Sequence, residues 1–168
     1  RQMCIRDRGI YAKGKRNSTF TEYYQDGVTP RKETPMQQGK IDGTVKTYFR
    51  NGKIEAEKEY KQSVESGRER RFDSKTGEQI FESHYIDGKK DGEEWEIFED
   101  ASTLRSRIIR HYRNGKLDGS YRVESTRDGK PYITIEGQYT DGEKSGQWIE
   151  HNYDNNTQTC TWHGEGGA

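Results

Sequence analysis

The stretch Tyr112-Arg113-Asn114-Gly115-Lys116-Leu117-Asp118-Gly119 carries a pattern, Tyr-x-x-Gly-Lys-x-x-Gly, that returns about every 25 residues along this 168-residue chain. The copies end at Ser18, Gly43, Gly67, Gly92, Gly119 and Gly146, with spacings of 25, 24, 25, 27 and 27 residues. Seven residues before each of these anchors stand Tyr11, Met36, Tyr60, Tyr85, Tyr112 and Tyr139. A fixed period in this range is typical of repeat architectures.

Each copy contains a second turn signal, seven to ten residues after its anchor. These signals are Asp26-Gly27, Asn51-Gly52, Thr76-Gly77, Glu99-Asp100, Asp128-Gly129 and Asn155-Asn156. Asn-Gly and Asp-Gly pairs between short strands favour hairpins, because both residues tolerate positive φ. The sequence therefore predicts an all-β fold, an elongated, single-layer antiparallel meander of about six two-stranded repeats.

The composition fits such a thin sheet better than a compact enzyme. Only 27% of the residues are hydrophobic and 35% are charged, too small an apolar inventory for a two-layer domain of this length. The 29 basic residues balance the 29 acidic ones, so no long-range field gathers DNA or anionic lipid. No apolar run approaches the roughly 18 residues that a membrane helix needs.

Strand alternation predicts which side chains share a face of the sheet. The tyrosine before each anchor shares a face with the residue four earlier, and the residue two past the anchor, such as Tyr121 or Trp148, belongs to the neighbouring strand. Trp95 stands three past its anchor, which predicts a bulge there, followed by a longer loop over Glu99 to Thr103. The Glu- and Lys-rich stretch from Lys53 to Ser66 would favour a helix by itself, but the repeat register predicts strand.

At these residues the chain resembles the MORN-repeat variant of YwqK-like antitoxin proteins, whose unit is similar to Gly-Lys-x-x-Gly-x-Trp-x-x-Tyr-x-x-Asn-Gly-Lys. The stretches that match best are 39–53, 87–95 and 114–119, whereas Ser63 and Val64 stand where Gly-Lys is usual. The resemblance covers roughly residues 11 to 156. It implies an open meander that contacts proteins, in a bacterial protein of antitoxin type.

Catalytic and metal-binding patterns are weak by comparison. The Gly-Lys pairs lie in hairpin turns with no helix after them, so a phosphate-binding loop is not expected. His84 and His111 occupy equivalent positions one repeat apart, yet two imidazoles without a third ligand make a poor zinc site. A single-layer sheet offers little cleft to desolvate a carboxylate pair such as Glu93-Glu94. We expect no enzyme activity, no metal and no cofactor.

A row of aromatic side chains rimmed by charge is the stronger functional signal. The candidate partner-binding residues are Trp95, Phe98, Tyr121, Trp148 and Tyr153. The expected function is non-catalytic protein binding, sharpened by the resemblance to an antitoxin or immunity protein that neutralises a toxin by surface contact. The alternatives are a structural scaffold at a membrane or cell envelope, with peripheral membrane contact, and a module that binds wall polymers. The compartment, bacterial cytoplasm or envelope, stays open.

The two ends of the chain are expected to differ from the repeats. Residues 1–8 can be back-translated into a string that resembles a transposase adaptor of sequencing libraries, which predicts a cloning or assembly artefact and a native frame that begins near Gly9. Residues 9–160 are then the repeat domain. Residues 161–168 form a Gly-rich tail, expected to be disordered or truncated.

Overall fold

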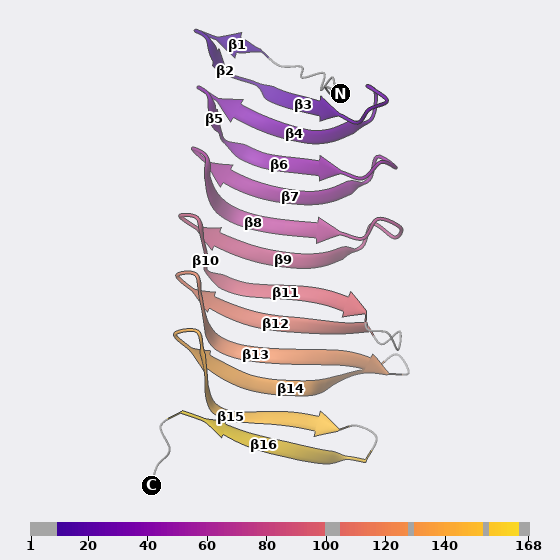
Figure 1. Cartoon of the computed structure of the whole chain (residues 1–168), viewed down its shortest axis with the longest axis vertical. Coiled ribbons are helices and arrows are strands. Elements are labelled where there is room, and N and C mark those ends of the chain that lie inside the picture. The colour runs from indigo at the N-terminus through magenta and orange to yellow at the C-terminus, as the bar shows by residue number, and fades with distance from the viewer. Residues whose placement is uncertain (1–9, 100–104, 128–129, 153–154, 165–168) are drawn as a thin grey trace. The chain divides into compact units, whose positions relative to one another are not determined.

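The computed structural model describes residues 10–99, 105–127, 130–152 and 155–164. None of these residues forms a helix, so they contain no helix that could cross a membrane. The chain divides into two units, residues 1–89 and 90–168. Within each unit the strands form a single antiparallel layer and follow one another across it in chain order (Figure 1). The predicted all-β meander of hairpin repeats is confirmed.

Unit 1 contains β1 (Tyr11–Ala12), β2 (Lys15–Arg16), β3 (Thr19–Tyr23), β4 (Pro30–Gln37), β5 (Lys40–Ile41), β6 (Gly43–Tyr48), β7 (Ile54–Lys61), β8 (Val64–Phe72) and β9 (Gln79–Ile86). Its main sheet has the order β3-β4-β6-β7-β8-β9, while β1 and β2 form a ladder of their own. Strands β7 and β8 occupy the stretch where local propensity favoured a helix, so the prediction of strand is confirmed there. The two-residue strand β10 (Lys89–Lys90) spans the division between the units.

Unit 2 contains β11 (Gly92–Glu99), β12 (Arg105–Arg113), β13 (Lys116–Arg127), β14 (Lys130–Thr140), β15 (Glu143–Asn152) and β16 (Thr157–His163), paired in that order. The predicted turn at Asp128-Gly129 and most of the predicted loop after Glu99 lie outside the described residues. The predicted tail begins inside β16, so residues 161–163 are strand.

The Gly-Lys part of the repeat pattern forms two-residue hairpin turns. At Asn114-Gly115 both central residues have positive φ, 52° and 87°, and Asp141-Gly142 repeats this with 52° and 96°. Turns with positive φ at both positions match the twist of the flanking strands, and Asn, Asp and Gly adopt them at least cost. The Gly115 amide donates to the Lys90 carbonyl at 2.8 Å, and the Gly142 amide donates to the Leu117 carbonyl at 2.8 Å. Backbone hydrogen bonds therefore join each turn glycine to the strand that follows the corresponding turn one repeat earlier.

The anchor glycines Gly119 and Gly146 lie at bulges that follow these turns. The turn is limited to Asp141-Gly142, and Gly146 lies inside β15. At Gly119 the β12–β13 register shifts between Arg110 and Tyr112, and φ is +117°. A Cβ there would also lie 3.0 Å from the His111 Cβ. Glycine is required because of both the backbone conformation and the close approach.

The two faces of each sheet differ in burial. In unit 2 we call one the packed face, defined by Glu94, Arg110, Tyr121, Val123 and Trp148, and the other the open face. The packed face holds the buried side chains of this unit, including Val123 at 7% exposure and the hydrogen-bonded pair Ser106 and Ser125, 2.8 Å apart. In unit 1 the packed face is defined by Val45, Lys58, Glu69, Phe81 and Ser83, which are opposite one another or alternate along their strands.

The predicted bulge at Trp95 is wrong in the ladder between β11 and β12. These strands pair without a register shift from Gly92 to Glu99, and Trp95 is directly opposite Ile109. Strict alternation then places Glu94, two past the anchor, at the packed-face position that Trp148 holds in the last repeat. Trp95 lies on the open face instead.

Candidate functional site

Aromatic rings fill the packed face of unit 2 on strands β13 to β15. Trp148 is 5% exposed, and its indole Nε1 donates to the Gln138 carbonyl at 3.1 Å. Its ring covers Gly137, where a Cβ would come within 2.3 Å of the indole. Tyr121 and Tyr139 pack against Trp148 with ring centroids 5.2 Å away. These rings hold adjacent strands together, and Trp148 is too buried to offer much area to a partner.

A carboxylate replaces the aromatic ring at the start of unit 2. The Glu94 side chain is 1% exposed, accepts a hydrogen bond from Arg110 Nη1 at 3.0 Å and is also paired with Lys90. The Tyr112 hydroxyl lies 3.4 Å from the same carboxylate. Buried carboxylates are tolerated when they are paired and hydrogen-bonded in this way.

Unit 1 repeats this arrangement around Glu69. Its carboxylate lies 3.0 Å from Lys58 Nζ and 3.1 Å from the Tyr85 hydroxyl, and Arg71 also binds it. Burial acts to raise the pKa of Glu69, but the hydrogen bond and charge of Lys58, with Arg71 and Tyr85, outweigh it, and the pKa is lowered. Burial and the charge of Glu69 raise the pKa of Tyr85 to about 12. Both glutamates are paired with cations and hydrogen-bonded to a tyrosine hydroxyl, and these contacts join neighbouring strands.

The open face of unit 2 carries a cross-strand row of half-exposed and exposed side chains, which we call the open-face row. Successive members are opposite one another in the registers of the five ladders: Trp95, Ile109, Arg122, Glu136, Ile149 and Cys160. The Arg107 guanidinium lies 4.5 Å from the centre of the Trp95 ring, a cation–π contact. Three large apolar side chains thus face outward beside charged ones.

The equivalent row of unit 1 begins at Thr21 on β3, and its other members are all charged: Glu33, Lys46, Glu57, Arg70 and Glu82. Glu57 pairs with Lys46 at 3.4 Å and with Arg70 at 2.7 Å. Because this sheet forms with a charged row, the fold itself does not demand apolar residues at these positions. The packing that the two units have in common therefore does not account for the apolar members of the row in unit 2.

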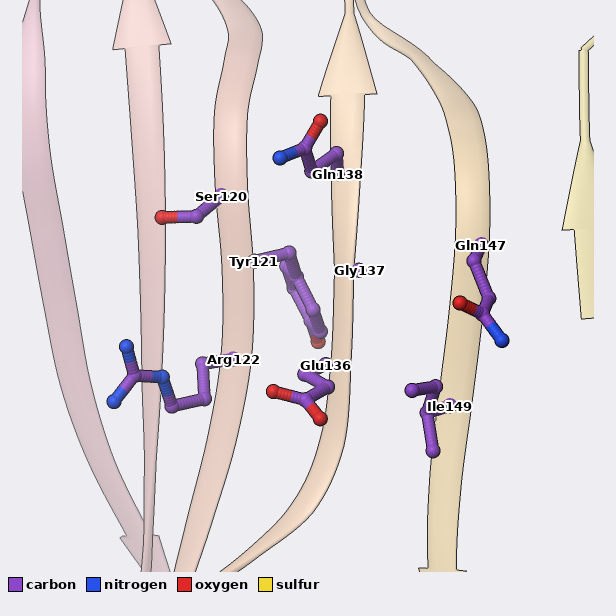
Figure 2. A pocket seen from close by; sticks show the side chains of 8 residues that line it. All are labelled: Ser120, Tyr121, Arg122, Glu136, Gly137, Gln138, Gln147 and Ile149. Carbon is purple, nitrogen blue, oxygen red and sulfur yellow. The ribbon is translucent and has the colours of Figure 1, made fainter. Parts of the chain in front are cut away.

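A hollow of about 410 Å³ opens on the open face over strands β13, β14 and β15. Figure 2 shows its lining, which is Ser120, Tyr121, Arg122, Glu136, Gly137, Gln138, Gln147 and Ile149. On the open face a guanidinium, a carboxylate, two amides and a serine hydroxyl surround one aliphatic side chain, and the packed-face residues Tyr121 and Gly137 lie between them along β13 and β14. Such a lining can hydrogen-bond a polar side chain while covering its apolar stem.

His111 lies beside the hollow and touches one of its lining residues. Its Nδ1 is 3.0 Å from the Ser120 hydroxyl and 3.2 Å from the Ser120 carbonyl oxygen, and its Nε2 is 3.7 Å from Glu93. The carbonyl oxygen can only accept, so the hydrogen bond to it uses the tautomer with the proton on Nδ1. The imidazole therefore fastens the bulge at Gly119.

The five candidate binding residues do not form one surface. Tyr121 and Trp148 pack together on the packed face, and Phe98, 38% exposed, lies on that same face opposite Ser106. Trp95 lies on the open face, and Tyr153 lies outside the described residues. Sequence reasoning missed Ile109 and Ile149. The alternation of each isoleucine within its own strand was visible in the sequence, but their alignment across the sheet depends on the strand registers.

Among the described residues, no group of three or more His, Cys, Asp or Glu side chains is arranged to hold a metal ion. No protein-family model matches the chain, and no curated protein matches it.

Proposed function

We propose that this chain is a non-catalytic protein-binding repeat module, and specifically an antitoxin or immunity protein that covers a toxin through the open face of unit 2. The observation that supports this is the contrast between the two rows. The row of unit 1 has no large apolar member and is charged at every position except Thr21, whereas its equivalent in unit 2 carries Trp95, Ile109 and Ile149. Outward-facing apolar groups that the fold does not require are typical of contact surfaces.

The chemistry of the open-face row describes the partner. Trp95 and Ile109 form one apolar end, and Ile149 lies on the far side of the Arg122 and Glu136 pair. Aromatic and arginine side chains at the centre of an interface contribute most of the binding energy. A complementary toxin surface presents an apolar patch for Trp95 and Ile109 and a polar side chain that enters the hollow.

Growth rescue tests the proposal. The toxin is taken from the reading frame adjacent to the one that encodes this chain, and it is expressed with the wild-type chain or with Ile109→Glu. The new carboxylate would lie opposite Arg122, so the sheet tolerates it while the apolar patch is lost. We expect wild type to restore growth and Ile109→Glu to fail.

Thr44→Lys in unit 1 is the matched control, because it also replaces a half-exposed β-branched residue by a charged one. The new ammonium group would lie across the strand pair from a residue of the opposite charge, Glu59. This variant should restore growth like wild type, and circular dichroism should show the same strand content in all three chains. Failure of wild type to restore growth, or full rescue by Ile109→Glu, would contradict the proposal.

A further inference from the structure

The hollow over β13, β14 and β15 lies where the ladder between β14 and β15 is irregular. Glu136 is opposite Ile149, and the next pair along this ladder is Gln138 with Ser145. One residue of β14, Gly137, therefore spans the same stretch as three residues of β15. The hollow of about 410 Å³ opens at this break in the regular pairing, so the strand register determines its position.

Two charged side chains line the hollow, and the positive one already has a partner. Arg122 Nη1 lies 3.2 Å from Glu124 Oε1 on the same strand. Figure 2 shows the Arg122 guanidinium on the side of its strand away from Glu136. The charge of Arg122 is therefore balanced by Glu124, and the carboxylate of Glu136 is left without a guanidinium.

The hydrogen-bond partner of Glu136 is a neutral imidazole. His151 Nε2 lies 3.2 Å from Glu136 Oε1, and His151 Nδ1 lies 3.2 Å from Gln158 Nε2. The amide nitrogen of Gln158 can only donate, so Nδ1 accepts and the ring proton on Nε2 is donated to Glu136. Among the residues that the structure describes, no lysine or arginine pairs with Glu136, whose side chain is 41% exposed. The hollow thus carries one negative charge that no cation balances.

We propose that this hollow binds a lysine side chain of the protein partner, with the ammonium group at the Glu136 carboxylate. The inference rests on the proposed function and specifies the chemistry of the group that enters the hollow. The side-chain amides of Gln138 and Gln147 are exposed on either side of the hollow and offer further oxygen acceptors. Ile149 supplies an apolar surface for the methylene stem of the lysine.

The contacts of Glu136 favour an ammonium group over a guanidinium. A guanidinium binds a carboxylate best through two parallel hydrogen bonds, one to each oxygen. In Glu136 one of these oxygens, Oε1, already accepts a hydrogen bond from His151. An ammonium group is a compact charge with three donors, so it can bind the second oxygen and the neighbouring amide oxygens together. An acidic side chain would be repelled by Glu136.

The test uses the full chain and three small probes, the Nα-acetyl N-methylamide derivatives of lysine, arginine and norleucine. Norleucine has an unbranched apolar side chain and no ammonium group. Each probe is titrated at constant ionic strength while NMR follows the side-chain amide signals of Gln138 and Gln147. We expect saturable shifts with the lysine derivative, weaker binding of the arginine derivative and no saturable shift with the norleucine derivative.

Two variants locate the charge that binds the lysine derivative. Glu136→Gln keeps the shape of the side chain but removes its charge, and it should weaken binding at least about threefold. Glu150→Gln removes the same charge from an exposed position of β15 on the opposite face, and it should leave binding unchanged. No saturable shift with the lysine derivative, equal affinity for the arginine or norleucine derivative, or full affinity of Glu136→Gln would overturn the proposal.

The complex with the toxin separates this inference from the proposed function. If Ile109→Glu weakens toxin binding while Glu136→Gln binds like wild type, the open face is the interface and the lysine contact is refuted. If the lysine derivative binds at Glu136 while Ile109→Glu leaves toxin binding unchanged, the lysine site is supported and the proposed function fails.

Discussion

Removal of Arg110 should destabilise the sheet strongly, because it leaves the buried Glu94 carboxylate with fewer positive partners. The Arg110 guanidinium lies 3.0 Å from Glu94, whose side chain is 1% exposed, and Arg110 itself is 22% exposed. At this separation and an effective dielectric of about 20, the attraction is roughly 5 kcal/mol before desolvation. Breaking a buried pair by removing one partner typically costs about 3–5 kcal/mol. Because Lys90 still contacts Glu94, we expect a loss of about 3 kcal/mol for Arg110→Met.

Urea unfolding followed by circular dichroism measures this loss, and a thermal melt should show a decrease in Tm of about 10 °C. Arg113→Met is the control on the same strand: its partner Asp118 is 3.5 Å away and Arg113 is 76% exposed, so the change should cost less than about 0.5 kcal/mol. The double variant Glu94→Leu with Arg110→Met removes both charges and should recover most of the stability. An Arg110→Met loss below about 1 kcal/mol, or a double variant no more stable than the single one, would refute the reasoning.

Three further predictions concern the backbone and the titratable groups. Gly119→Ala, at φ +117° and with a Cβ contact of 3.0 Å, should cost about 2–3 kcal/mol in urea unfolding, whereas Gly142→Ala, with φ +96° but open space, should cost about 1 kcal/mol. The pKa of Glu69 is lower in the folded than in the unfolded chain, so the stabilisation from its pairing with Lys58 is complete above the unfolded pKa and is lost as pH falls through the folded pKa. The urea midpoint should therefore fall on acidification from about pH 5, and a midpoint independent of pH in that range would contradict this. Burial and a hydrogen bond to Glu33 raise the pKa of Tyr48 to about 12, so the ultraviolet titration of Tyr48 should occur at a higher pH than that of exposed tyrosines. The free energy of unfolding should decrease as pH rises from about 10 toward 12.

The repeat period predicted the strands and turns because positive φ restricts the choice of residue. Asn114-Gly115 and its equivalents could be recognised from the residue pairs themselves, and the positions of these turns then predicted where the strands between them begin and end. The stretch from Lys53 to Ser66 shows the same dominance, since cross-strand pairing in β7 and β8 prevails over a local preference for helix. The bulge glycines were visible as a pattern, but only the structure separates a turn glycine from one that avoids a side chain such as His111.

The candidate site was less accessible to sequence reasoning. A carboxylate such as Glu94 could not be expected at an aromatic position, because the cations that neutralise it come from other parts of the chain. With Glu94 at the packed-face position, the next residue, Trp95, lies on the opposite face. From the sequence alone, the shifted position of this tryptophan had predicted a bulge. The open-face row consists of single residues from six strands, so it exists only once the strand registers are known.

The central claim is that the open face of unit 2 binds the partner, and the dissociation constant of the purified complex with the toxin tests it most directly. Isothermal titration with wild type, Ile109→Glu and Thr44→Lys compares the apolar row with the charged face of unit 1. Truncation of an interface hot spot costs at least about 2 kcal/mol, equivalent to about 30-fold in affinity. We predict that Ile109→Glu weakens binding by at least that factor and that Thr44→Lys changes it by less than about threefold. Equal affinities for wild type and Ile109→Glu, or a greater loss for Thr44→Lys, would contradict the account.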